Sequence, residues 1–278
     1  MTSGLVEGEQ VGIRLGAGAN AFEAVQALDF SIEPGQFVCI LGPSGCGKST
    51  LLGALAGHLQ PSSGHLRVDG APVDGPSPSR GMVFQHHTLL PWRKVLDNVA
   101  FGLKMQGVPR RDRHRQAMDM LRWVGLEDFA GHWPRQLSGG MQQRAEIARV
   151  LINRPRLLLM DEPFGALDAQ TRSRMQQLLL DIWSRIGTTV VFVTHDIDEA
   201  LFLGDRVLVM SARPGRFIAD LTLPFPRPRQ PSLLTSPAFV ELKRHCLELL
   251  DHGPDAPPLP RLTPLGLPRQ QDLSRIAL

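Results

Sequence analysis

Residues 42–50 have the spacing of a phosphate-binding loop. They read Gly42-Pro43-Ser44-Gly45-Cys46-Gly47-Lys48-Ser49-Thr50 and match G-x-x-x-x-G-K-[ST]. The glycines allow successive backbone N–H groups to turn inward around phosphate oxygens, and the helix pattern that follows adds the partial positive charge of a helix N-terminus. We expect Lys48 to reach the outer phosphates of a nucleotide and the Ser49 hydroxyl to ligate Mg²⁺. Cys46 is expected to be a small filler, because no base that would activate its thiol lies near it in the sequence.

A pair of carboxylates follows a second apolar run. Residues 157–160 lead into Asp161-Glu162-Pro163. A nucleotide-hydrolysing site beside a phosphate loop needs one acid to hold Mg²⁺ through water and another to orient or deprotonate the attacking water. Asp161 and Glu162 suit these two roles. Alone the pair is weak evidence, because an acid that caps a helix or turn is common at the end of a strand, but together with the loop it indicates hydrolysis.

A second anion-binding turn lies at Ser138-Gly139-Gly140, where a helix over about 140–152 is expected to begin. One nucleotide does not need two such turns from a single chain. The sequence therefore predicts a dimer in which each nucleotide is shared by two copies.

Residues 137–144, Leu-Ser-Gly-Gly-Met-Gln-Gln-Arg, resemble the LSGGQ signature of the ATP-binding-cassette (ABC) ATPases. Met141 stands where the signature usually has glutamine, a substitution that occurs in the importer branch, and Gln142 follows it. The resemblance covers about residues 10–222. It implies a phosphate-loop ABC cassette with a RecA-like α/β core, a small antiparallel β piece and an inserted helical subdomain. It also implies ATP and Mg²⁺ as ligands.

The same resemblance assigns roles to further residues. Gln85, in GMVFQ, matches the glutamine that reaches Mg²⁺ and the attacking water and senses the transmembrane partner. Asp168, in Ala-Leu-Asp, matches the segment that crosses the dimer interface, and His195 matches the switch histidine that contacts the γ-phosphate. The implied catalytic residues are Glu162, His195 and Gln85, the implied Mg²⁺ ligands are Ser49, Gln85 and Asp161, and the implied ATP-binding residues are those of the loop with Ser138, Gly139, Gly140, Gln142 and Asp168.

The adenine position departs from the family pattern. ABC ATPases usually stack adenine on an aromatic residue, most often tyrosine, before the first core strand, and this chain has no tyrosine. Leu15 aligns near that position. Phe22 is the nearest aromatic residue and is expected to be out of register with it.

Apolar runs and helical patterns alternate over most of the chain. Short apolar runs at 37–41, 157–160, 189–193 and 206–210 predict buried strands, and the segments 111–124, 140–152 and 168–186 have helical periodicity. This alternation predicts a largely parallel sheet in an α/β domain. Asp69-Gly70, within 66–73, predicts a hairpin in a small antiparallel piece. We expect an ATPase domain at 1–223, with the helical subdomain at about 88–150.

Residues 224–278 are expected to be an extension, because they contain 11 of the 23 prolines. Their proline density predicts that they lie outside the core. A short helix is expected at 237–250, with Ser236 as N-cap and an apolar stripe of Phe239, Leu242, Cys246 and Leu250. This helix could dock onto the protein's own surface or serve a regulatory partner.

Composition excludes several other classes. Hydrophobic residues at 42% and charged residues at 21% are typical of a globular chain, which excludes a disordered or coiled-coil protein. The charge surplus of +3, without interleaved aromatic residues, disfavours nucleic-acid binding. The sequence has no apolar run of about 18 residues, so no membrane span is predicted. No signal peptide is recognised at the start. Three cysteines predict neither a disulfide framework nor a zinc site, which fits the cytosol.

Further segments resemble one branch of the family, the nitrate, sulfonate and taurine importer ATPases. These segments are 88–92, 95–99, 160–168 and 210–216. The resemblance implies a head-to-tail homodimer at the cytoplasmic face of the inner membrane, bound to transmembrane permease subunits and served indirectly by a periplasmic solute-binding protein. Leu89, Leu90 and Trp92 could form the permease groove or pack in the core. The alternatives are an importer ATPase for another solute such as a thiamine precursor, a mechanical ABC ATPase outside transport, and a phosphate-loop kinase.

Overall fold

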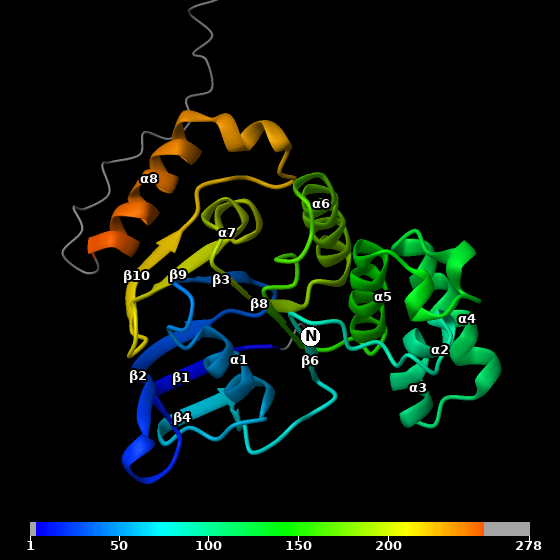
Figure 1. Ribbon diagram of the computed structural model, residues 1–278, viewed down its shortest axis with the longest axis horizontal. Helices are drawn as coiled ribbons and strands as arrows, with labels where there is room; N and C mark the ends of the chain where they lie inside the picture. The colour runs from blue at the N-terminus through cyan, green and yellow to red at the C-terminus, as the bar shows by residue number, and fades with distance from the viewer. Residues whose placement is uncertain (1–3, 253–278) are drawn as a thin grey trace, which may run out of the picture.

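A six-stranded sheet with the order β10-β9-β3-β8-β7-β6 forms the centre of the computed structural model, which describes residues 4–252 (Figure 1). The strands from β9 to β6 are parallel, and β10 pairs antiparallel with β9 at one edge. The strands are β3 (Phe37–Leu41), β6 (Arg80–Val83), β7 (Leu157–Asp161), β8 (Thr189–Thr194), β9 (Arg206–Met210) and β10 (Phe217–Thr222). The four predicted core strands are thus confirmed.

The central strands are apolar throughout because both of their faces are covered. The helices around the sheet are α1 (Lys48–Ala56), α5 (Gly139–Leu151), α6 (Ala169–Ile186) and α7 (Ile197–Leu203). In β3, Phe37, Cys39 and Leu41 belong to a cluster with α5, α6 and α7, whereas Val38 and Ile40 belong to a second cluster with α1.

A smaller antiparallel sheet, with the order β2-β1-β4-β5, packs with α1 against the second face. Its strands are β1 (Val6–Leu15), β2 (Phe22–Ile32), β4 (Ser63–Val68) and β5 (Ala71–Pro72). The predicted hairpin is confirmed: Val68 pairs with Ala71, and the turn residues Asp69 and Gly70 have φ values of 53° and 74°. Two successive positive φ values suit the right-handed twist of a two-residue hairpin.

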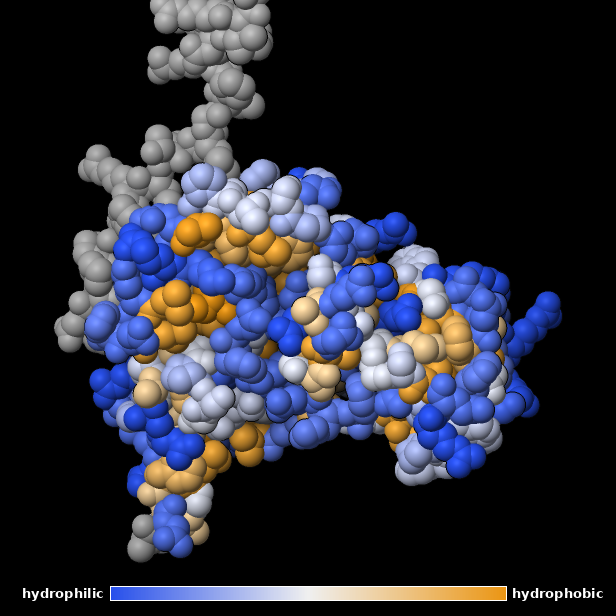
Figure 2. Space-filling view, turned by 45° about the horizontal axis from the view of Figure 1, so that its top comes forward, coloured by the Kyte–Doolittle hydropathy of each residue, from blue (hydrophilic) through white to orange (hydrophobic). Residues whose placement is uncertain are grey.

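Short helices inserted between β6 and β7 form a helical lobe. Figure 2 shows this lobe projecting from the rest of the molecule. It contains α2 (Val95–Val99), α3 (Phe101–Met105), α4 (Arg110–Trp123), 3-10 turns at Glu127–Phe129 and Pro134–Gln136, and the signature helix α5. Across residues 4–252, no helix combines the length and apolar character needed to cross a bilayer.

The chain after β10 returns over the core through a 3-10 turn at Pro231–Thr235 and α8 (Pro237–His252), which lies beside α7 (Figure 1). The Ser236 hydroxyl accepts a hydrogen bond from the Phe239 backbone N–H at 3.3 Å, as predicted for the N-cap. Side chains of this segment join the larger core cluster, so the expectation that residues after 223 lie outside the core is wrong for 225–249. The buried side chains are Phe225, Phe239, Leu242, Cys246 and Leu249, with Leu250 only partly buried. Residues 253–278 of the expected extension lie outside the described residues.

Two arginines fasten this segment to the last turn of α7, whose carbonyls have no partner within the helix. Arg229 donates to the Phe202 carbonyl at 2.8 Å, and Arg227 donates to the Leu203 carbonyl at 2.7 Å. Arg227 also pairs with Asp205. Burial, with repulsion from Arg227, lowers the pKa of Arg229 to about 10. The proline-rich segment is therefore held by specific polar contacts as well as by apolar burial.

Candidate nucleotide site

Neighbouring parallel strands end at one edge of the main sheet, and the predicted site residues follow those ends. β3 leads into Gly42, β7 into Glu162, β8 into His195, and β6 runs toward Gln85. The strand register keeps the ends of β3, β7 and β8 level with one another. The carboxyl edge of a parallel sheet is where such folds bind ligands, because loops and helix N-termini meet there.

The phosphate loop wraps closely around its own lysine. Gly47 has a φ of 111°, and a Cβ there would lie 2.6 Å from the Ala24 carbonyl oxygen, so the position requires glycine. The Lys48 side chain is 4% exposed, and its ammonium donates to the carbonyls of Gly42 at 2.8 Å and Pro43 at 2.9 Å. The loop therefore holds a buried cation at the start of α1.

Asp161 and Ser49 form the second element of the site. The Ser49 hydroxyl donates to Asp161 Oδ1 at 2.9 Å, which joins the end of β7 to the first turn of α1. Burial raises the pKa of the Asp161 carboxyl, and the hydrogen bond from Ser49 partly offsets this effect. A bound cation would favour the ionised form of this carboxylate.

Glu162 lies at the centre of the predicted catalytic residues. Its Oε2 lies 3.0 Å from His195 Nδ1 and accepts a hydrogen bond from the Gln85 amide at 3.5 Å, and its Oε1 lies 3.9 Å from Lys48 Nζ. Its backbone has a φ of 41°, an uncommon left-handed conformation that is found mainly where surrounding structure imposes it. The structure thus brings Gln85, Glu162 and His195 together beside the loop.

The donor set fits Mg²⁺, which prefers oxygen ligands and usually shares them with substrate phosphates. The Ser49 hydroxyl, the Asp161 carboxylate and the Gln85 side-chain amide supply oxygens at this edge. Within residues 4–252, no three His, Cys, Asp or Glu side chains form a metal-binding cluster by themselves.

A cavity of about 300 Å³ opens over the loop. Its lining contains Gln85 and Glu162 together with Leu15, Phe22 and Arg213. Cys46 is buried within the loop, and desolvation raises the pKa of its thiol. This agrees with its expected role as a filler, because a buried thiol with a raised pKa is a poor nucleophile.

The signature turn lies apart from this cavity. Ser138 and Gly140 line a different cavity, of about 520 Å³, and neither contributes to the cavity at Lys48. Ser138 is exposed and caps α5 by accepting a hydrogen bond from the Met141 backbone N–H at 3.4 Å. A single chain therefore keeps the two predicted anion-binding turns separate.

Two predicted ATP-binding residues have local structural partners. The Gln142 amide donates to the carbonyls of Pro134 at 2.9 Å and Leu137 at 3.3 Å, so it braces the turn before the signature helix. Asp168 caps α6 by accepting from the Thr171 backbone N–H at 3.0 Å, and this hydrogen bond lowers the pKa of its carboxyl. Their contact with a nucleotide stays a prediction.

Glu146 is a buried residue of α5 that sequence reasoning missed. Its carboxylate accepts hydrogen bonds from the backbone N–H groups of Thr88 and Leu89, the latter at 3.1 Å, and Arg149 donates to the Thr88 carbonyl at 2.8 Å. These contacts join the segment after Gln85 to the signature helix. A glutamate inside the otherwise apolar stretch 145–148 was the available signal, because a buried charge requires partners.

The residues that were candidates for a permease groove, Leu89, Leu90 and Trp92, differ in their exposure. Leu89 is buried in the core, whereas Trp92 is 69% exposed. Buried Asn98 holds the intervening loop by accepting from the Leu90 N–H at 2.7 Å and donating to the Arg93 carbonyl at 2.9 Å. Core packing is thus the role of Leu89, while Trp92 faces outward.

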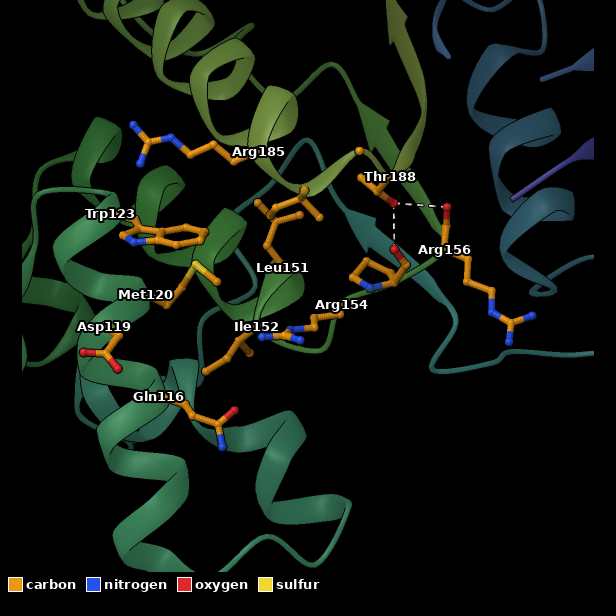
Figure 3. A pocket seen from close by; sticks show the side chains of 13 residues that line it. Gln116, Asp119, Met120, Trp123, Leu151, Ile152, Arg154, Arg156, Arg185 and Thr188 are labelled. Atoms are coloured by element: carbon orange, nitrogen blue, oxygen red, sulfur yellow. Dashed lines mark hydrogen bonds between the residues drawn. The ribbon is translucent and has the colours of Figure 1, made fainter. Parts of the chain in front are cut away.

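A larger cavity, of about 640 Å³, lies between α4 and the end of α6 (Figure 3). Trp123 and Arg185 line it, and the Thr188 hydroxyl donates to the carbonyls of Pro155 and Arg156 at 2.6 and 3.0 Å. It shares no lining residue with the cavity at the phosphate loop. Size therefore does not identify the nucleotide site in this molecule.

Comparison with known proteins decides the family. The family model for ABC transporters matches residues 25–165. The chain belongs to the ABC transporter ATPase family. The predicted family and fold are therefore confirmed, and the protein is an ATP-binding, ATP-hydrolysing cassette.

Curated ABC relatives cover most of the chain. A taurine import ATP-binding protein, TauB, of Rhizobium johnstonii is 51% identical over 84% of this chain and 90% of its own length. A nitrate import ATP-binding protein, NrtD, of Synechocystis is 51% identical over 73% of this chain and 76% of its own length. The ATP-binding cassette MJ0796, solved as a dimer in a post-hydrolysis state with ADP and Pi, superposes with a TM-score of 0.69 at 34% identity, covering 78% of this chain and 98% of that one.

Proposed function

We propose that this ABC ATPase energises an importer for small anions of the nitrate, sulfonate or taurine class. The convergence of Lys48, Asp161, Glu162 and His195 at one sheet edge carries the catalytic part of the proposal. The relatives named for taurine and nitrate import support the solute class. An importer ATPase for another solute, such as a thiamine precursor, is the competing assignment.

Two copies acting head to tail would complete each ATP site. One copy supplies Lys48 and Glu162, and its partner supplies Ser138 and the N–H groups at the start of its α5. The separation of these turns within one chain supports this arrangement, as does the dimeric state of the similar cassette MJ0796. The γ-phosphate would bridge the two copies, so its removal would allow the dimer to open.

The chemistry at the loop follows from the positions of the side chains. The loop N–H groups and Lys48 bind the phosphates, with Lys48 exchanging the Gly42 and Pro43 carbonyls for phosphate oxygens. Glu162 orients the attacking water and accepts its proton, while His195 fixes the Glu162 carboxylate through the 3.0 Å contact. Mg²⁺, when bound by Ser49, Asp161 and Gln85, neutralises charge on the phosphates.

A groove lined by residues that precede and follow Gln85 in the sequence is the proposed contact for the permease. It has a volume of about 460 Å³ and is lined largely by apolar side chains, among them Leu90, Phe101 and Met105. Met105 is 63% exposed. Glu146 connects the chain between Gln85 and this groove to α5, so groove contacts and the signature turn would move together. Binding there would hold the ATPase at the cytoplasmic face of the inner membrane.

Growth of a deletion strain tests the solute assignment. A strain lacking this gene should fail to grow on taurine, another sulfonate or nitrate as sole source of sulfur or nitrogen. The unmodified protein should restore growth, and the Glu162→Gln variant should not. Normal growth on all three sources, with a new requirement for thiamine, would instead support the competing assignment.

A further inference from the structure

The segment 210–216, which resembles part of the importer branch, lies against both the phosphate loop and β2. The Gly215 N–H donates to the Ala24 carbonyl, and the Gln26 N–H donates to the Gly215 carbonyl, both at 3.0 Å. A Cβ at Gly215 would lie 2.2 Å from the Cys46 carbonyl oxygen, so only glycine allows this approach. The segment is therefore fixed against the loop by backbone contacts.

This segment places Arg213 next to the phosphate loop, in the lining of the cavity. Its Nε and Nη2 donate to the Gly45 carbonyl at 3.2 and 3.1 Å, and its Cζ lies 4.5 Å from the centroid of the Phe22 ring. No carboxylate in residues 4–252 forms an ion pair with this guanidinium. Arg213 is thus a cation held by a ring and a carbonyl at the edge of the nucleotide cavity.

The strand register brings Phe22 beside Leu15, the residue that aligns with the family's aromatic position. Leu15 and Phe22 are direct partners in the β1–β2 ladder, and both line the cavity. Phe22 therefore lies across the ladder from the aligned position, and it lines the same cavity from the neighbouring strand. The connection between the two strands contains a short 3-10 turn at Gly18–Asn20, and its length lets residues seven apart meet across the ladder. The Phe22 side chain remains 39% exposed.

Two chemically distinct groups of side chains meet at the cavity. Arg213 bonds to the Gly45 carbonyl and contacts the Phe22 ring, whereas Lys48 and Ser49 lie near the carboxylates of Glu162 and Asp161. Phosphates belong with Lys48 and Ser49, so the base of a nucleotide would lie against Phe22 and Arg213. A flat ring and a planar guanidinium there match the flat face of a nucleobase, which stacks on both kinds of surface.

We propose that Phe22 and Arg213 together bind the nucleobase, in place of an aromatic side chain at position 15. This inference rests on the proposed ATP site. Such a surface recognises the face of a base and not its edge, and Leu15, Phe22, Ala24 and Arg213 offer no side-chain acceptor for the adenine amino group. The full-length protein should therefore bind ATP and GTP with affinities within about threefold of each other, because stacking is tolerant of base identity.

Binding measurements on the full-length protein test this. The ligands are the β,γ-imido analogues of ATP and GTP and inorganic tripolyphosphate, each with Mg²⁺. Phe22→Ala should weaken binding of both nucleotide analogues by on the order of tenfold and leave tripolyphosphate binding unchanged. Arg213→Lys should also weaken binding of both nucleotide analogues, because lysine keeps the positive charge but lacks the planar guanidinium group. Leu15→Tyr in the Phe22→Ala background should restore affinity, and Arg14→Ala on the same strand is the matched control.

Two results would overturn the inference. Unchanged nucleotide binding in Phe22→Ala and Arg213→Lys would place the base elsewhere, and an equal loss of tripolyphosphate binding would show that the pair only supports the loop. A preference for ATP over GTP of tenfold or more would contradict recognition by stacking alone. An unmodified protein that binds none of the three ligands would instead overturn the nucleotide site itself.

Discussion

The phosphate-loop half and the signature half of the ATP site differ in how firmly this chain holds them. Lys48 is 4% exposed and bonded to its own loop, at the edge of a sheet covered on both faces. Ser138 and Gly139 are exposed at the start of a helix in the projecting lobe. The chain therefore preorganises its phosphate-binding loop, whereas in the proposed shared site the signature half would depend on where the lobe meets a partner.

Glu146 and Arg149 form the link between the two halves. Both lie on α5, whose first turn carries the signature motif, and both bind the segment that follows Gln85. A displacement of α5 would therefore move the segment after Gln85, and a displacement of that segment would move α5. The phosphate-loop half and the signature half are coupled through hydrogen bonds to a few backbone groups.

The largest expected effect comes from breaking the phosphate-loop half at Glu162. Glu162→Gln keeps the size of the side chain and removes its basicity, so steady-state ATP hydrolysis should fall about 10²–10⁴-fold. ATP binding should be retained, because Lys48, Ser49 and Asp161 are unchanged. Glu127→Gln, at an exposed position of the lobe, is the matched control and should hydrolyse ATP at the normal rate.

Removing the segment that fastens α7 should destabilise the phosphate-loop half. A chain ending at residue 223 loses Phe225, Phe239 and Leu242, and we expect its free energy of unfolding to fall by at least about 3 kcal/mol. A chain ending at residue 252 keeps all the described contacts and serves as control. Chemical denaturation measures both. Equal stability of the two chains would show that 1–223 folds as an independent domain.

Substitution of Lys48 tests the phosphate-loop half through nucleotide affinity. Lys48→Ala removes a cation that forms charge-assisted hydrogen bonds, so the affinity for an ATP analogue should fall roughly 10- to 100-fold. Lys104→Ala, an exposed lysine on α3, should bind normally. Titration with a fluorescent ATP analogue separates the variants, and an unaltered affinity in Lys48→Ala would exclude the phosphate-loop assignment.

The smallest effect is expected at the link between the halves. Glu146→Ala leaves the N–H groups of Thr88 and Leu89, the latter buried, without their carboxylate acceptor, which should lower the free energy of unfolding by about 1–3 kcal/mol. Glu146→Gln retains an acceptor oxygen and should lose less. If both variants unfold like the unmodified protein in denaturant, these hydrogen bonds do not hold the segment.

The fold and the phosphate-loop half were largely predictable because their signals are local. The loop, the strand that ends at Asp161 and the hairpin at Asp69-Gly70 each occupy a few consecutive residues with a fixed conformational requirement. The family resemblance extended these signals to Gln85 and His195, and the structure brings both to Glu162.

The missed features depend on contacts between distant residues. Glu146 meets Thr88 and Leu89 across more than fifty residues, and Phe22 reaches its place only through the register of a two-strand ladder. Core membership of the proline-rich segment was not predicted because proline density argues against regular structure, whereas Arg227 and Arg229 bind helix carbonyls from outside any helix or strand. Periodicity and composition carry no information on such partners.

The sharing of each ATP site between two copies is tested most directly by the molar mass of Glu162→Gln in solution. Size-exclusion chromatography with light scattering, at saturating ATP and Mg²⁺, should show a shift from monomer to dimer, because ATP bridges the copies and is not removed. Ser138→Arg in the same chain should abolish this dimer without reducing ATP binding, since the signature turn contacts only the partner's nucleotide. A Glu162→Gln/Ser138→Arg double variant that dimerises with ATP as fully as Glu162→Gln would contradict the shared site.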